Sequence, residues 1–106
     1  MKKLILAIFT VLILMAPLTA DWVGFYGYVY YQGSPVNGAY VEIKKTDNSF
    51  CDTVQTNANG YYYCACFSGT YNMKAWQGER LHVKNNQYNN GQPGGVQVDF
   101  NLQEMP

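Results

Sequence analysis

The stretch "GYVYYQGSPVNGAYVEI", residues 27–43, contains two short runs of alternating side chains on either side of a turn. Successive side chains of a β-strand point to opposite faces, so each run suits a strand with one buried face. Between the runs, "QGSPVNG" (32–38) is rich in the residues that turns favour. The stretch therefore predicts two β-strands joined by a turn.

The same pattern recurs along the chain. No stretch after residue 20 has the 3.6-residue apolar period of a helix, whereas short alternating runs bounded by Gly, Pro and Asn are frequent. We expect strands at 23–31, 39–45, 50–56, 61–67, 70–76, 79–85 and 96–102, and a long Asn/Gln/Gly loop at 85–95. Strands in this number and at this spacing predict an all-β chain folded as a single two-sheet β-sandwich of seven strands.

Alternation also assigns the inner and outer faces of these strands. Residues of one parity are apolar and are expected in the core: Val41, Ile43, Tyr62, Cys64, Cys66, Tyr71, Met73, Ala75, Leu81, Val83, Val96, Val98, Phe100 and Leu102. By the same rule His82, the only histidine, is predicted to face solvent between Arg80 and Lys84.

The first twenty residues predict a secretory signal peptide. Lys2 and Lys3 precede an apolar run of 13 residues, and Ala20 provides a small residue for cleavage. The run is shorter than the roughly 20 residues that a membrane-spanning helix needs, although an uncleaved anchor is the alternative. We expect cleavage after Ala20 to leave residues 21–106 as one secreted or cell-surface domain with no membrane segment.

The charge of residues 21–106 argues against nucleic acid as a partner. This part has five Lys and Arg and seven Asp and Glu, so its net charge is 5 − 7 = −2. A nucleic-acid-binding surface needs an excess of positive charge.

Three motifs together resemble the carboxypeptidase regulatory-like domains. They are residues 27–43, then "TNANGYY" (56–62), then "SGTYNM" (68–73), in the order found in that family. The resemblance implies an immunoglobulin-like or transthyretin-like Greek-key sandwich of seven strands. It also implies a non-enzymatic module, of the kind that is appended to enzymes, fused to transporters or built into stalks and adhesins. Asn57 and Asn59 stand where relatives often have aspartates, so no calcium site is implied.

The residues themselves predict no catalytic site and no cofactor. The carboxylates are spread over separate strands and loops, His82 is expected to point away from the cysteines, and no glycine-rich phosphate loop opens a helix. Cys64 and Cys66 are separated by one residue and lack the loop of a zinc knuckle. We therefore expect no metal site and no enzymatic activity.

The three cysteines predict a disulfide. If "NANG" (57–60) closes a hairpin, paired residues have numbers that sum to 117, so Cys51 lies opposite Cys66. Secretion favours oxidation, so we expect a Cys51–Cys66 disulfide, or Cys51–Cys64 if the register slips. Three reduced thiols are the alternative. The remaining cysteine, for which Cys64 is the candidate, is either a buried thiol or a link to a second copy of the chain.

The first strand and the aromatic residues suggest interaction with a partner. The stretch "DWVGFYGYVYY" (21–31) either pairs within its own sheet or adds to a neighbour's open edge to form a filament. Outward parity is shared by the candidate binding residues Tyr26, Tyr28, Tyr30, Tyr40, Tyr61, Tyr63 and Trp76. These rings either bind a polysaccharide or a surface protein, or stabilise the sheet as cross-strand pairs.

The sequence thus predicts a secreted or cell-surface, non-catalytic structural module that self-associates through its aromatic strand. The alternative is a carbohydrate- or protein-binding accessory module, as in cell adhesion.

Overall fold

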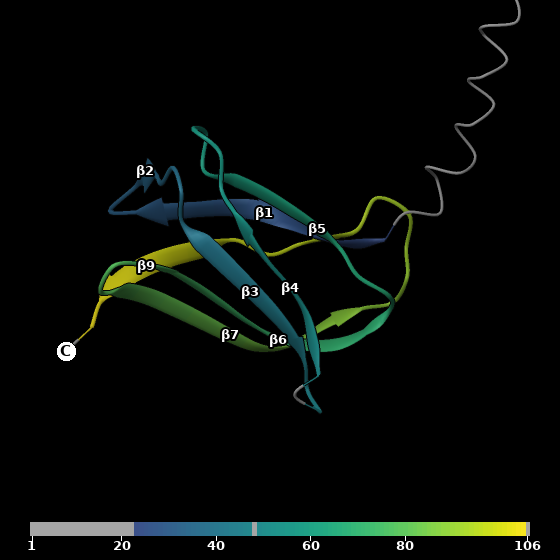
Figure 1. The fold of residues 1–106 in the computed structure, drawn as a ribbon. Coiled ribbons are helices and arrows are strands. Elements are labelled where there is room, and N and C mark those ends of the chain that lie inside the picture. Colours follow the sequence, from purple (N-terminus) through teal and green to yellow (C-terminus); the bar gives the residue numbers. More distant parts are fainter. Residues whose placement is uncertain (1–22, 48, 106) are drawn as a thin grey trace, which may run out of the picture.

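The structure, a computed structural model, describes residues 23–47 and 49–105, and every regular element of this part is a β-strand (Figure 1). The all-β prediction is confirmed for these residues. The predicted signal peptide, residues 1–20, lies outside the described residues. Within the described part there is no helix of the length and apolarity needed to cross a membrane.

The strands follow the predicted order closely. They are β1 (Gly24–Tyr31), β2 (Ser34–Pro35), β3 (Tyr40–Lys45), β4 (Phe50–Gln55), β5 (Tyr61–Ala65), β6 (Gly69–Gln77), β7 (Arg80–Asn89), β8 (Val96–Gln97) and β9 (Phe100–Glu104). The main differences from the prediction are three. A two-residue strand, β2, lies inside the predicted turn at 32–38, and two boundaries also move. The last strand is divided into β8 and β9, and β7 continues to Asn89 because residues 87–89 pair with residues 69–71 of β6. Pairing with a neighbour overrides the weak strand preference of asparagine.

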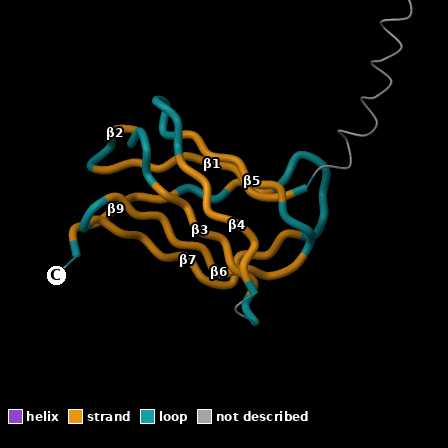
Figure 2. The backbone as a smooth tube through the Cα atoms, viewed as in Figure 1, coloured by secondary structure: helices purple, strands orange, loops and turns teal. Residues whose placement is uncertain are grey.

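The strands form one curled, mixed sheet. Hydrogen-bonded neighbours follow the order β2-β1-β9-β7-β6-β3-β4, and β5 and β8 also pair with β1. β1 runs parallel to β8 and β9, whereas the other pairs are antiparallel. Figure 2 shows β1 and β5 on one side of the molecule and β3, β4, β6 and β7 on the other. The core lies between these two sides.

Most predicted core residues are buried, including Val41, Ile43, Tyr62, Tyr71, Met73, Ala75, Phe100 and Leu102. β7 is the main exception, because Val83 is 45% exposed and Leu81 is half-buried; Val96 of β8 is half-buried as well. The β6–β7 turn explains the error: Gln77 pairs with Arg80, which sets Ala75 opposite His82. Cross-strand partners share a face, so His82 shares the inward face of Ala75. The prediction that His82 faces solvent was therefore wrong.

The connection from β4 to β5 differs from the predicted hairpin. The turn itself forms, because the Asn57 N–H donates to the Tyr61 carbonyl (3.0 Å) and the Gly60 N–H donates to the Asn57 carbonyl (2.9 Å). However, β4 pairs with β3, and β5 pairs with β1. The predicted pairing of β4 with β5 was wrong, since the chain passes at this turn from one side of the curled sheet to the other.

Gly60 fits this crossing because it has no side chain. Its φ is 78°, and a Cβ atom there would lie 2.8 Å from the Val29 carbonyl oxygen. That close approach accompanies a hydrogen bond from the Val29 N–H to the Gly60 carbonyl (2.8 Å). A larger residue would push the turn away from β1.

Candidate functional site

Five tyrosines lie on the outer side of β1 and β5. These strands pair antiparallel, with Tyr26 opposite Tyr63 and Tyr28 opposite Tyr61. We call this surface the tyrosine face; it consists of Tyr26, Tyr28, Tyr30, Tyr61 and Tyr63. The sequence identified all five residues but did not show that their two strands are neighbours.

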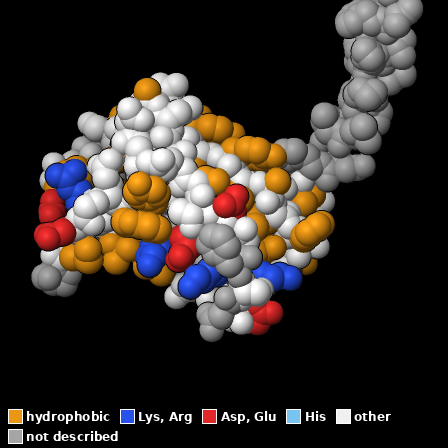
Figure 3. All heavy atoms as spheres, in the orientation of Figure 1, with side chains coloured by type: hydrophobic (Ala, Val, Ile, Leu, Met, Phe, Trp, Pro, Cys, Tyr) orange, Lys and Arg blue, Asp and Glu red, His pale blue; other side chains and the backbone are white. Residues whose placement is uncertain are grey.

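The rings of the tyrosine face form a nearly continuous layer. The Tyr28 ring lies edge-on to the Tyr61 ring with 5.4 Å between centroids, and it stacks on Tyr30 at 6.2 Å. Tyr26 extends the layer, with its centroid 6.5 Å from that of Tyr61. At the upper rim of Figure 3, over β1 and β5, hydrophobic side chains gather. The face offers flat apolar rings and phenolic hydroxyls to a partner.

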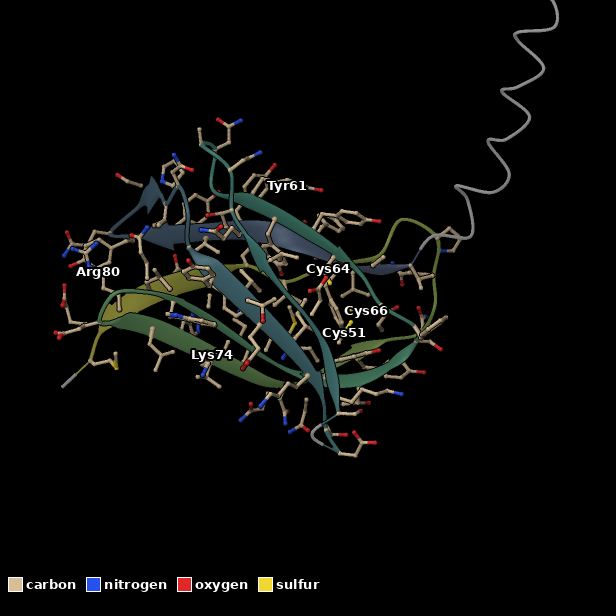
Figure 4. All side chains as sticks on the ribbon, viewed as in Figure 1. Cys51, Tyr61, Cys64, Cys66, Lys74 and Arg80 are labelled. Atoms are coloured by element: carbon tan, nitrogen blue, oxygen red, sulfur yellow. The ribbon has the colours of Figure 1, made fainter. Side chains whose placement is uncertain are left out.

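Tyr40 and Trp76 belong to a different surface. They stack on each other across β3 and β6, with 5.3 Å between ring centroids. The Lys74 ammonium lies 5.1 Å from the Trp76 ring centroid and 3.8 Å from a Glu42 carboxylate oxygen. Figure 4 shows Tyr61 and Lys74 beside different parts of the sheet. The seven predicted binding residues therefore form two groups and not one.

The three cysteines meet between the two edge strands of the sheet, in a region that we call the seam. Cys51 lies on β4, Cys64 on β5, and Cys66 directly after β5 (Figure 4). Their Sγ atoms all lie within 4.8 Å of one another, and those of Cys64 and Cys66 are 3.6 Å apart. All three are free thiols in this structure. The prediction that Cys51 pairs with Cys66 or Cys64 is thus compatible with the position of the sulfurs and remains a prediction.

The thiols of the seam differ in acidity. The hydrogen bond between the Cys64 and Cys66 sulfurs lowers the pKa of Cys64 below the ordinary value of a cysteine. The same bond, together with burial, raises the pKa of Cys66, and burial raises the pKa of Cys51. Cys64 is therefore the thiol that loses its proton most readily.

A pocket of about 530 Å³ opens beside the seam. Cys51 and Cys66 line it together with Lys45, Phe67 and Tyr71. Phe67 is 87% exposed, and its backbone carbonyl is held in place by a hydrogen bond from the Tyr71 hydroxyl (2.8 Å). The sequence alone did not indicate this pocket. Alternation along the chain could have indicated the exposure of Phe67, since the residue after inward-facing Cys66 is expected to point outward.

His82 is held apart from the thiols. Its ring packs edge-on against Phe100 with 5.6 Å between centroids, and its Nδ1 atom accepts a hydrogen bond from the Asn101 N–H (2.8 Å). Burial lowers the pKa of His82, and Lys84 adds to this effect. The ring therefore has a structural contact on the inner side of β7, and it does not activate a cysteine.

Comparison with known proteins leaves the family of this chain open. No family model and no curated protein matches it. Among solved structures, the dioxygenase domain of a dioxygenase and carbohydrate-binding protein fusion from the cellulolytic bacterium Streptomyces sp. SirexAA-E matches with a TM-score of 0.49 and 12% identity. The match covers 79% of this chain and 80% of that one. A likeness at this level defines neither the fold nor the activity of this chain.

Proposed function

We propose that this chain is a non-catalytic binding module and that its tyrosine face binds an extended carbohydrate. One observation carries the proposal: the rings of Tyr26, Tyr28, Tyr30 and Tyr61 lie in contact as a single layer on two paired strands. Contiguous apolar surface on a small protein often marks an interaction site. Aromatic rings with hydroxyl groups suit the alternating apolar and polar surface of a sugar chain.

The shape of the face favours a long ligand over a compact one. Tyr26, Tyr28 and Tyr30 follow one strand, so at about 3.3 Å per residue the row extends roughly 13 Å. Tyr28 stacks on Tyr30 along this row, and Tyr61 of β5 contacts both Tyr26 and Tyr28. A linear polysaccharide can contact successive rings at once.

We further propose that the module is secreted. We also propose that it belongs to the carboxypeptidase regulatory-like family and that its curled sheet is a variant of the Greek-key sandwich of that family. The turn glycines of the matching motifs support this assignment, since Gly33, Gly38 and Gly60 have φ values of 84°, 82° and 78°. Those values are in the left-handed region that glycine favours.

Self-association is the second candidate function, and we propose that it would use side chains rather than the backbone of β1. That backbone pairs with β5 over residues 24–28 and with β9 over residues 29–31. Adding a neighbour's strand to β1 would therefore require breaking an existing pair. A second copy would instead cover the tyrosine face.

The test is a triple variant, Tyr26→Ser, Tyr28→Ser and Tyr30→Ser, measured by affinity electrophoresis against a panel of soluble polysaccharides. We expect wild-type retardation on at least one polysaccharide and a loss of at least tenfold in affinity in the variant, equivalent to about 1.4 kcal/mol. Tyr40→Ser is the matched control, because Tyr40 is 42% exposed on the other aromatic surface; it should bind like the wild type.

The alternatives give different results. Each lost ring contact is expected to cost the sheet about 0.2–1 kcal/mol, so the assay is run well below the melting temperature of the variant. Unchanged affinity of the folded triple variant would mean that the rings are structural. If the wild type binds no polysaccharide but forms dimers that the triple variant abolishes, as measured by sedimentation, the face is a self-association surface and the carbohydrate proposal is wrong.

A further inference from the structure

We propose that the reduced protein binds one thiophilic metal ion, Zn(II) or Cu(I), through Cys51, Cys64 and Cys66 at the seam. This site is separate from the tyrosine face, and the proposal does not depend on carbohydrate binding.

The sulfur positions fit a three-thiolate site. A Zn–S bond is about 2.3 Å long, so sulfurs around a common ion lie roughly 3.8–4.0 Å apart for tetrahedral or trigonal geometry. The Sγ atoms of Cys64 and Cys66 are 3.6 Å apart, and all three atoms lie within 4.8 Å of one another. Small rotations of the side chains are enough to bring three thiolates onto one ion.

The fold explains why the sequence did not reveal this site. A zinc knuckle supplies neighbouring ligands from a short loop, and residues 64–66 are not such a loop. Here Cys64 and Cys66 have the same parity, and Cys51 comes from the opposite edge strand. The two edges are held by different partners, since β4 pairs with β3 and β5 with β1. The sheet therefore assembles two ligands from one edge and one from the other.

The surroundings allow an ion to enter and to be held. The pocket beside Cys51 and Cys66 is open to solvent and leaves space for a water as a fourth ligand. Lys45 lines the same pocket, whereas the Asp52 carboxylate adds negative charge beside Cys51 and Cys64. Thiolate ligands select Zn(II) and Cu(I) over hard ions such as Mg(II). Binding would release the thiol protons to solvent and would connect β4 to β5.

The experiment uses the whole secreted protein, reduced and kept free of oxygen. Zn(II) and Cu(I) are added separately in competition with a chromophoric chelator, and Mg(II) is the hard-ion control. We expect one equivalent of Zn(II) or Cu(I) to bind, the melting temperature to rise, and all three thiols to be protected from alkylation. Mg(II) should produce none of these effects.

Variants locate the ion. Cys51→Ser, Cys64→Ser and Cys66→Ser should each weaken binding by more than the roughly 10–100-fold that loss of an outer-shell partner costs. Thr53→Ser, a conservative change on the same strand as Cys51, should bind like the wild type.

Two results would overturn the proposal. One is a binding constant that none of the three cysteine variants changes. The other is equal alkylation of the wild-type thiols with and without Zn(II) or Cu(I), a measurement that does not require any variant to fold. Because neither readout involves a polysaccharide, the metal site and the tyrosine face can fail independently.

Discussion

His82 is a single side chain that connects two strands. Its ring covers Phe100, a fully buried residue of β9, and its Nδ1 atom accepts a hydrogen bond from the Asn101 N–H at 2.8 Å. An imidazole accepts at Nδ1 only while that atom carries no proton. The folded chain therefore favours the neutral ring, in agreement with the lowered pKa of His82.

This preference predicts a dependence of stability on pH. The unfolded chain binds a proton at His82 near pH 6.5, whereas the folded chain binds it only at lower pH, because burial disfavours the charged ring. The contribution of the neutral His82 ring to the free energy of unfolding is therefore fully present above about pH 6.5 and is lost as the pH falls below this value. We expect the urea midpoint of the wild type to fall more between about pH 7.5 and about pH 5.5 than that of His82→Gln.

The variant is also the control for other groups that titrate. Asp47 and Glu104 have pKa values lowered by hydrogen bonds from Ser49 and Tyr31, so they titrate mainly below this interval. Equal shifts of the midpoint in wild type and His82→Gln would show that the ring contributes nothing to the pH dependence.

At the scale of the elements, Asp99 joins three strands where β8 ends and β9 begins. Its Oδ1 atom accepts a hydrogen bond from the Tyr28 N–H of β1 at 2.9 Å. At the same position β1 lies close to the backbone between β8 and β9: a Cβ on Gly27 would lie 2.1 Å from the Val98 carbonyl oxygen. A carboxylate oxygen thus replaces the backbone acceptor that the break in the strand removes.

Loss of this acceptor is expected to destabilise the fold. Asp99→Ala leaves the half-buried Tyr28 N–H without its partner, and we expect a decrease of about 1–3 kcal/mol in the free energy of unfolding. Asp99→Asn retains an oxygen at this position and is the matched control, with an expected cost below about 1 kcal/mol. Chemical denaturation of both variants measures the difference, and equal costs would assign the effect to charge and not to the hydrogen bond.

The elements also show which parts of the fold the sequence predicts. Alternation located the strands because it depends only on neighbouring residues. It failed for β7, where apolar Leu81 and Val83 suggested the inner face but the two-residue turn, with Gln77 opposite Arg80, fixed the register. A count of turn residues would have corrected this error. With a two-residue turn, odd-numbered residues of β6 lie opposite even-numbered residues of β7, so His82 shares the face of Ala75.

The arrangement of the whole molecule was less accessible from the sequence. The turn at residues 57–60 was predicted, yet the strands on either side of it join different partners, because Thr56 donates to the Ala39 carbonyl and Gly60 accepts from Val29. These are contacts between distant residues, which local patterns do not encode. The structure brings the three cysteines together through the curl of the sheet and not through the predicted hairpin.

Because the sheet is curled, β4 and β5 lie near each other as edge strands without pairing through backbone hydrogen bonds, and the three thiols lie between them. Oxidation of Cys51 with Cys66 or Cys64 would close this seam covalently. For a loop of this length we expect the disulfide to raise the free energy of unfolding by about 3 kcal/mol over that of the reduced protein. Guanidinium denaturation of both forms measures the gain, and peptide mapping without reduction identifies the pair. Three alkylatable thiols after oxidation, or a disulfide between two molecules, would contradict this prediction.

The disulfide and the metal ion are mutually exclusive at the seam, and this gives the disulfide prediction a second test. A disulfide uses two of the three thiols, so the oxidised protein should bind neither Zn(II) nor Cu(I) at the seam, whereas the reduced protein should bind one equivalent. Reduction should therefore lower stability and restore metal binding together. If the oxidised protein retains full metal affinity, the intramolecular disulfide has not formed at the seam, and Cys51 must be paired elsewhere or remain reduced.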